Sequence, residues 1–209
     1  SANQNNSDAQ YLLGEIYYTG EYVSRNINKS IHYLTLSANQ NNSNAQYLLG
    51  KINYSGEYIS RDINKSIHYL TLSANQNDSD AQFLLGYIYY LGEDISRDIN
   101  KSIHYLTLSA NQNDPNAQFL LGKIYYLGEY ISNDINKSIH YLTLSANQNN
   151  INAQYYLGEI YYKGEYISRN INKSIHYLTL SANQNNLDAQ FLLGKIYCLN
   201  EHISRDIHK

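Results

Sequence analysis

A 36-residue repeat runs through the whole sequence. The string SANQN returns after every 36 residues, and the longer segment INKSIHYLTLSANQN recurs almost unchanged. The string begins at six positions: Ser1, Ser37, Ser73, Ser109, Ser145 and Ser181. A period of this size is typical of stacked supersecondary units, which bury their apolar faces only against one another. The repeat therefore predicts a solenoid before any local pattern is considered.

The first half of each repeat carries the pattern of an amphipathic helix. In the first repeat, Ala9, Leu13 and Tyr17 follow one another at the spacing of a single helix face. Asn6 stands where an N-cap side chain would accept hydrogen bonds from free N–H groups of the first turn. Gly20 stands where a left-handed residue without a Cβ closes a helix at least cost. We therefore expect a helix between Asn6 and Gly20.

The second half of each repeat predicts another helix, from about Ile27 to Gln40. Its apolar stripe consists of Ile27, Ile31, Leu34 and Ala38. Asn26 is the expected N-cap, Asn41 the expected left-handed stop, and Val23 of the connecting loop is expected to close the helix pair from below. The equivalent caps of the later repeats are Asp62, Asp98, Asp134, Asn170 and Asp206.

The pattern predicts eleven helices, which are six first helices and five second helices. The last first helix is expected near Leu187–Leu199, and its second helix would only begin at Ile207. We expect a single array with repeats at residues 7–42, 43–78, 79–114, 115–150, 151–186 and a truncated 187–209. Because the chain lacks methionine and starts and stops in mid-pattern, we expect it to be part of a longer protein.

A glycine interrupts the middle of each first helix. Gly14 returns in all later repeats, although glycine inside a helix costs about 1 kcal/mol relative to alanine. Neighbouring helices lie about 8–10 Å apart, and small residues set the lower limit of that distance. We interpret the glycine as a point of close helix approach, with Ser30 as the small partner residue on the second helix.

Charge and hydropathy exclude several classes of protein. The formal net charge is −3 and the isoelectric point is near 6.1, whereas a nucleic-acid groove or an anionic membrane surface requires a basic face. An array that reads RNA bases with repeats of similar length is therefore disfavoured. No apolar run approaches the roughly 18 residues of a membrane span, so we expect no membrane insertion.

The repeat resembles the SEL-one-like repeat (SLR) family, which is related to the tetratricopeptide repeats. The resemblance is carried by Ala9, Leu13, Gly14, Tyr17, Gly20, Val23, Lys29, Ser30, Tyr33, Ser37 and Ala38. The chain departs from the family pattern at Tyr22, where a glycine is usual, and at Asn53, which interrupts the tyrosine series of Tyr17. The resemblance implies an all-α, right-handed α-solenoid whose first helices line a concave surface, and a role as an adaptor or scaffold.

Comparison of the repeats separates constant from variable positions. The second helix hardly changes from repeat to repeat. In the first helix, the residues at positions 8, 15 and 19, numbered as in the first repeat, vary and share one helix face. Together with the tyrosine at position 18, they predict a groove for an extended or helical segment of a partner protein. The candidate binding residues are Glu15, Tyr18, Lys51, Tyr54, Tyr87, Tyr90, Lys123, Tyr126, Glu159 and Tyr162. The alternatives are tyrosines that pack between adjacent repeats and charges that form a solvated face.

The sequence contains no recognisable catalytic motif. It lacks a phosphate-binding glycine loop, a His-Glu metal motif and a nucleophile elbow, so we expect no enzyme activity, no catalytic residue and no cofactor. The histidines at His32, His68, His104, His140 and His176 should face solvent, and no repeated Cys or carboxylate stands beside them to complete a zinc site.

The alternatives to a protein-binding scaffold are a structural spacer, a hydrolase or an RNA-binding array. Stacking of the uncovered last helix on another copy would give end-to-end self-association. The sequence leaves open whether the protein is cytoplasmic or secreted.

Overall fold

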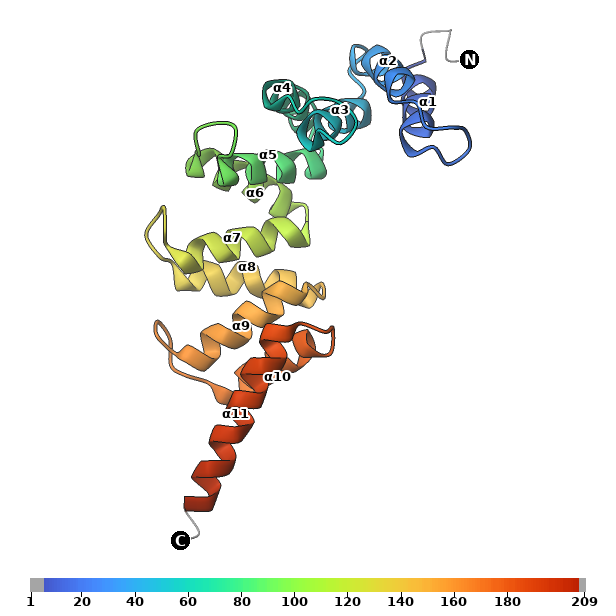
Figure 1. Ribbon diagram of the computed structural model, residues 1–209. Helices are drawn as coiled ribbons and strands as arrows, with labels where there is room; N and C mark the ends of the chain where they lie inside the picture. Colours follow the sequence, from blue (N-terminus) through green and yellow to red (C-terminus); the bar gives the residue numbers. More distant parts are fainter. Residues whose placement is uncertain (1–5, 207–209) are drawn as a thin grey trace. The chain divides into compact units, whose positions relative to one another are not determined.

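The computed structural model describes the backbone of residues 6–206 and the side chains of residues 6–199 (Figure 1). The described residues up to Gln112 form one compact unit, and those from Asn113 form a second. The N-terminal unit contains α1 (Ser7–Thr19), α2 (Ile27–Ala38), α3 (Ser43–Ser55), α4 (Ile63–Ala74), α5 (Ser79–Leu91) and α6 (Ile99–Asn111). The C-terminal unit contains α7 (Pro115–Leu127), α8 (Ile135–Asn147), α9 (Ile151–Lys163), α10 (Ile171–Ala182) and α11 (Leu187–Asp206). Across residues 6–206 there are eleven helices and no strand, which confirms the all-α repeat fold.

Polar side chains cap the N-termini of the helices at the positions that the sequence predicts. The Asn6 side chain accepts a hydrogen bond from the Ala9 N–H at 2.9 Å, and Asp62 accepts one from the Lys65 N–H at 3.0 Å. Pro115 occupies the first turn of α7, where its missing N–H leaves no partner unsatisfied. The local sequence therefore determines where each of these helices starts.

A left-handed glycine ends each first helix from α1 to α9, as predicted, whereas α2 ends at Ala38 and not near Gln40, three residues before the left-handed Asn41 that we expected to stop it. Gly20 follows α1 with φ 72° and donates its N–H to the Ile16 carbonyl. Asn41 has φ 65°, and its counterparts in the other described repeats share this conformation, which asparagine tolerates better than most residues. A backbone hydrogen bond of 2.9 Å from the Asn26 N–H to the Tyr17 carbonyl closes the loop between the two helices. The left-handed Gly20 and the hydrogen bond of Asn26 therefore determine the length of this loop.

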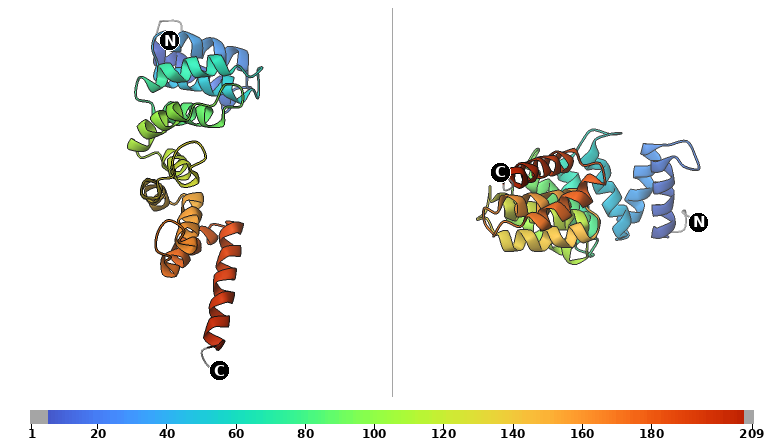
Figure 2. Two further views of the ribbon diagram at one scale, coloured as in Figure 1. Left: turned by 90° about the vertical axis from the view of Figure 1, so that its left-hand side faces the viewer. Right: turned by 90° about the horizontal axis from the view of Figure 1, so that it is seen from below.

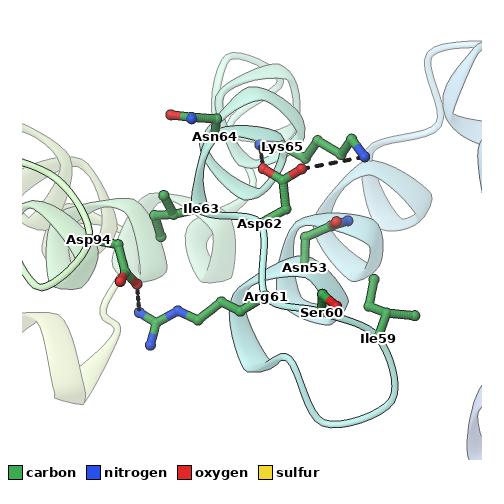
Figure 3. Close-up of a pocket in the computed structure, with 9 residues that line it drawn as sticks. All are labelled: Asn53, Ile59, Ser60, Arg61, Asp62, Ile63, Asn64, Lys65 and Asp94. Atoms are coloured by element: carbon green, nitrogen blue, oxygen red, sulfur yellow. Dashed lines mark hydrogen bonds and ion pairs between the residues drawn. The ribbon is translucent and has the colours of Figure 1, made fainter.

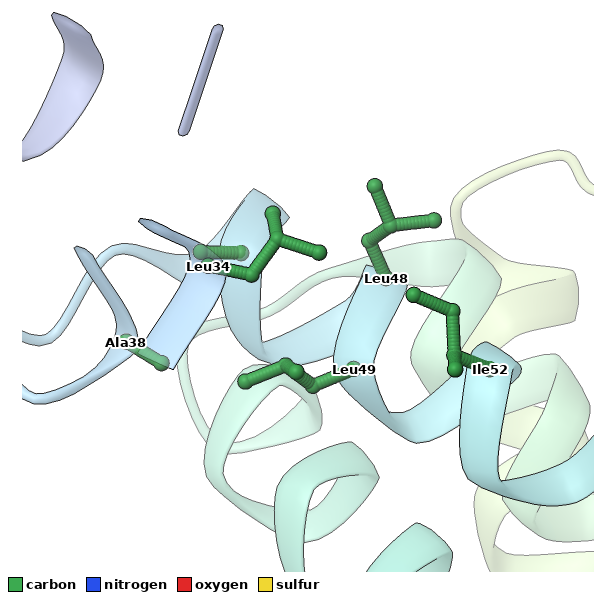
Figure 4. Packing of buried hydrophobic residues seen from close by; sticks show 6 residues of the cluster. Leu34, Ala38, Leu48, Leu49 and Ile52 are labelled. Carbon is green, nitrogen blue, oxygen red and sulfur yellow. The ribbon is translucent and has the colours of Figure 1, made fainter. Parts of the chain in front are cut away.

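The hydrophobic clusters lie between consecutive repeats. Leu34 of α2 packs against Leu49 and Ile52 of α3, and all three side chains are almost completely buried (Figure 4). The loop residue Ile59 packs on the same cluster, whereas its counterpart Val23 in the first repeat is exposed. Within each compact unit, a second helix is therefore shared between its own repeat and the next one, as stacking requires.

The helical glycine marks a close approach, but its main partner is a leucine. A Cβ added to Gly14 would lie 2.6 Å from Cγ of Leu34, and the same contact recurs at the other glycines through Gly158. Ser30, which we expected to be the partner, is fully buried beside this contact. In the fifth repeat, the equivalent Ser174 donates a hydrogen bond of 2.8 Å to the Gly158 carbonyl. The serine packs beside the glycine backbone, and the leucine fills the space of the missing Cβ.

The last helix is longer than predicted. α11 continues without interruption through Asp206, as Figures 1 and 2 show, whereas the sequence pattern predicts an end near Leu199 and a cap at Asp206. Asn200 stands where the earlier repeats have the left-handed glycine of Gly164, so the strongest stop signal is missing. The second helix expected from Ile207 lies outside the described residues.

None of the described helices is both long enough and apolar enough to cross a membrane.

Candidate functional site

Similar hollows lie between successive first helices. The hollow between α1 and α3 has a volume of about 350 Å³, and that between α3 and α5 about 330 Å³. A third, of about 220 Å³, lies between α9 and α11 in the C-terminal unit. All three use positions 11, 15, 18 and 19 of one repeat and positions 8, 11 and 12 of the next. The repeat therefore builds one kind of hollow several times, with different side chains at its rim.

The hollow between α1 and α3 combines an acidic and a basic side. The Tyr11 hydroxyl donates a hydrogen bond of 2.9 Å to Oε1 of Glu15. Burial, with the hydrogen bond and the charge of Glu15, raises the pKa of Tyr11 to about 12. Lys51 stands on the opposite wall, and Asp80 lies at the edge. Phenol, carboxylate and ammonium groups therefore face one small space.

The hollow between α3 and α5 is more apolar. Tyr47, Tyr54, Phe83 and Leu84 contribute most of its wall, and Lys51 and Asp80 stand at its rim. The Arg61 guanidinium lies 4.8 Å from the centre of the Tyr54 ring, which fixes this ring between the repeats. Burial, with a smaller contribution from Tyr87, raises the pKa of Tyr54, and Arg61 partly offsets that rise.

The hollow between α9 and α11 has an ion pair on one wall. Lys163 Nζ lies 3.0 Å from Oε1 of Glu159 and 3.3 Å from the Tyr126 hydroxyl. Burial lowers the pKa of Lys163, but its hydrogen bonds to Glu159 and Tyr126 outweigh that effect and raise it overall. Lys195 lies 6.0 Å from the Tyr162 ring on the facing wall. The space is therefore lined by fixed charges and aromatic rings.

The structure brings together six of the ten predicted binding residues in these hollows. They are Glu15, Tyr18, Lys51, Tyr54, Glu159 and Tyr162. The other four, which are Tyr87, Tyr90, Lys123 and Tyr126, lie outside the three hollows. Tyr126 is only 9% exposed and packs edge-on against Tyr156. The tyrosines of this series therefore have a packing role as well, since Tyr18 and Tyr162 also contact the clusters between repeats.

Positions 11 and 12 also line the hollows, and sequence reasoning missed them. Tyr47 and Phe83 represent position 11, and Leu48 and Leu84 represent position 12. They vary little in polarity from repeat to repeat, so internal comparison did not distinguish them from core residues. The signal that could have found them is the helical spacing, because position 11 lies four residues before position 15.

A further hollow of about 560 Å³ lies at the loop between α3 and α4 (Figure 3). Its lining residues are Asn53, Ile59, Ser60, Arg61, Asp62, Ile63, Asn64, Lys65 and Asp94. Lys65 pairs with Asp62 at 3.4 Å, and Arg61 pairs with Asp94 of the next loop at 2.9 Å. One of its lining residues is Asn53, which stands in the second repeat where the first repeat has Tyr17.

The histidine series lies on the exposed side of the second helices, as expected. His32 contacts the edge of the following Tyr33 at a ring separation of 5.2 Å, and the later histidines make the same contact. Among the described side chains, no group of three or more His, Cys, Asp and Glu residues is placed to hold a metal ion.

Comparison with known proteins agrees with this architecture. The family model described as "Sel1 repeat" matches residues 7–42, 43–78, 79–114, 115–150, 151–186 and 187–209. No curated protein shows a significant sequence match to the chain.

Two solved structures are similar to the chain along most of its length. One is a protective antigen present in uropathogenic Escherichia coli strains that displays an SLR fold, with 31% identity and a TM-score of 0.88. The match covers 94% of this chain and 42% of the antigen, so the chain spans less than half of that relative. The other is a Sel1 repeat protein from Oxalobacter formigenes, with 29% identity, a TM-score of 0.80 and coverage of 92% of this chain and 79% of that one.

Proposed function

Because the chain belongs to the Sel1 repeat family, whose members are generally protein-interaction scaffolds without enzyme activity, we propose that it binds a segment of a partner protein on its first helices. The observation that carries this proposal is the recurrence of one hollow between α1 and α3, between α3 and α5, and between α9 and α11. A partner segment that crosses α1, α3 and α5 would place one side chain in each of the two hollows between these helices.

The charges at the rims suggest how such a segment is selected. Glu15 and Lys51 lie on opposite walls of the hollow between α1 and α3, and Lys51 and Asp80 stand at the rim of the next. Adjacent packed helices are about 8–10 Å apart, which an extended chain in the polyproline II conformation covers in about three residues while keeping every third side chain on one face. We therefore propose an extended partner with an apolar or aromatic residue at about every third position and charged residues between them.

Affinity capture followed by mass spectrometry tests this proposal. The charge-reversed variant Glu15→Lys/Lys51→Glu keeps the net charge and should lose the partner that the unchanged protein captures. The matched control is Asn28→Lys/Asn100→Glu, which introduces one positive and one negative charge at two exposed second-helix positions and also keeps the net charge. Equal capture by the two variants would refute a binding role of the first helices. Failure to capture any partner from its own source would favour the structural spacer.

Self-association through α11 is a separate proposal about partners. Leu187 and Phe191 of this helix are each 76% exposed, which is unusual for large apolar side chains on one helix. We propose that this face packs on a second copy of the chain. Light scattering of Phe191→Lys should then report a smaller mass than the unchanged protein at the same concentration. A monomeric unchanged protein at high concentration would overturn this proposal.

A further inference from the structure

Four repeats share a stacked pair of tyrosines between their two helices. In the first repeat, the Tyr17 ring of α1 lies 6.0 Å from the Tyr33 ring of α2, with an interplanar angle of 6°. Three other repeats repeat this geometry within 0.1 Å and 1°, in the pairs Tyr89–Tyr105, Tyr125–Tyr141 and Tyr161–Tyr177. The stack is thus a fixed part of the repeat.

A lysine also lies over the ring of the first tyrosine in each of these repeats. Nζ of Lys29 lies 5.1 Å from the centre of the Tyr17 ring, and the equivalent distances in the other three repeats are 4.9–5.0 Å. An aromatic ring that contacts both a second ring and an ammonium group gains from both stacking and cation–π attraction. The repeat therefore forms a small binding environment for an aromatic ring, which its own tyrosine occupies.

The second repeat retains Tyr69 and Lys65 at the equivalent positions but lacks the ring that their counterparts contact. Asn53 replaces the tyrosine and turns back to its own helix, where its Nδ2 donates a hydrogen bond of 2.8 Å to the Leu49 carbonyl. Tyr69 still packs against the cluster formed around Leu34, as Tyr105 and Tyr177 do in their repeats. Lys65 lines the hollow instead of covering a ring (Figure 3).

A second substitution opens the same hollow from the neighbouring loop. In the first repeat, the Arg25 guanidinium lies 4.9 Å from the ring of Tyr58, which belongs to the loop of the next repeat. At the equivalent place after the second repeat, Asp94 replaces the loop tyrosine and pairs with Arg61. Two departures from the repeat pattern therefore remove two rings from one place, and the hollow of about 560 Å³ lies there.

We propose that the hollow at Asn53 binds an aromatic side chain of a partner protein, in the position that tyrosine occupies in the other repeats. By analogy with the Tyr17–Tyr33 and Lys29–Tyr17 contacts of the first repeat, the incoming ring stacks on Tyr69 and lies near Nζ of Lys65. A phenol fits best, because the Arg61–Asp94 pair and the Asn53 amide supply polar groups for its hydroxyl. This site is formed by the loop after α3 and is separate from the first-helix hollows, so its test does not depend on them.

The probe is p-cresol, which has the size and chemistry of a tyrosine side chain. Titration into the isotope-labelled protein should shift the NMR signals of the Asn53 side-chain amide and of the Ser60–Lys65 backbone, with a dissociation constant on the order of 1–10 mM for so small a ligand. Cyclohexanol, which is similar in size but not aromatic, should bind at least about threefold more weakly, because it lacks the ring that stacking and cation–π attraction require. Equal binding of the two compounds would overturn the aromatic assignment.

Two variants provide matched tests within the same chain. Asn53→Tyr restores the missing ring and should abolish the p-cresol shifts near Lys65. Tyr17→Asn/Tyr58→Asp removes both equivalent rings at the first repeat and should create new shifts near Lys29, while the original ones persist. Thermal unfolding followed by circular dichroism confirms that both variants are folded. Shifts near Lys65 that persist in Asn53→Tyr, or their absence in the unchanged protein up to about 20 mM p-cresol, which exceeds the expected dissociation constant, would refute the site.

Discussion

The helices α9 and α11 carry the same sequence pattern but have different surroundings. α9 lies between α8 and α10, and Leu157 and Gly158 in its middle are buried. In α11, Leu193 is only half-buried, and a Cβ added to Gly194 would meet nothing within 4 Å. The repeat pattern therefore determines the helix, whereas the burial of its middle depends on packing against a following second helix such as α10.

The largest expected difference concerns the two equivalent leucines. Leu157 is 0% exposed, so Leu157→Ala should lower the free energy of unfolding by about 2–5 kcal/mol through lost burial and a residual cavity. Leu193→Ala should cost less than half of that, because its side chain is already partly in water before unfolding. Urea unfolding followed by circular dichroism measures both values. Equal losses would show that a further element covers α11 in solution.

The two equivalent glycines should respond with opposite sign. A Cβ at Gly158 would lie 2.5 Å from Cγ of Leu178, so Gly158→Ala should destabilise by about 1–3 kcal/mol despite the better helix propensity of alanine. Gly194→Ala meets no neighbour and should stabilise the protein by roughly 0.5–1 kcal/mol. The shift in melting temperature gives both signs in one experiment. A loss of stability in Gly194→Ala would contradict the open surroundings of this residue.

The ends of the two helices provide a smaller contrast. Gly164 ends α9 with φ 65°, and Gly164→Ala should cost about 1–2 kcal/mol because alanine is strained in this conformation. Asn200→Gly places the missing stop signal in α11 and should change the overall stability by less than about 1 kcal/mol, because it mainly affects the end of the helix. Amide hydrogen exchange should nevertheless become faster over residues 201–206 in this variant. Unchanged exchange there would mean that the glycine is not what limits the length of the first helices.

The sequence predicts the local structure well because its determinants are local. Asn6 and Asp62 act as caps, and Gly20 and Asn41 take left-handed conformations, all within a few residues of the groups they serve. Gly14 was correctly interpreted as a close contact, but its partner Leu34 could not be identified. That assignment requires the rotation of one helix about its axis relative to the other, which residue spacing does not report.

The candidate site was predicted only in part for a related reason. The variable positions led to Glu15 and Lys51, which do face each other across a hollow, but Tyr126 of the same prediction is buried. The difference arises because each hollow is formed by two repeats, and the packing of the adjacent repeat determines which face of a tyrosine ring remains accessible to solvent. The interruption at Asn53 was visible in the sequence, whereas the simultaneous loss of the ring at Asp94 matters only because the two loops meet.

The smallest expected effect concerns proton binding at equivalent positions of α9 and α11, where Tyr155 corresponds to Phe191. Burial raises the pKa of Tyr155, and the charges of Glu159 and Asp188 add to the rise. The unfolded chain therefore loses this proton first, near pH 10, and the contribution of Tyr155 to stability is intact below that pH and falls as the pH rises through the folded pKa. Tyr155→Phe removes this titration.

Between about pH 9.5 and pH 11, the free energy of unfolding of the unchanged protein should therefore fall relative to that of Tyr155→Phe, because only the unchanged protein has this proton to lose near pH 10. The measurement is the difference between the two urea midpoints at each pH, since the chain has 24 tyrosines whose common titration cancels in the difference. Tyr197→Phe in α11 is the control for loss of a hydroxyl from an exposed ring. A difference that stays constant with pH would show that the ring of Tyr155 is as well solvated in α9 as the uncovered side chains of α11 are.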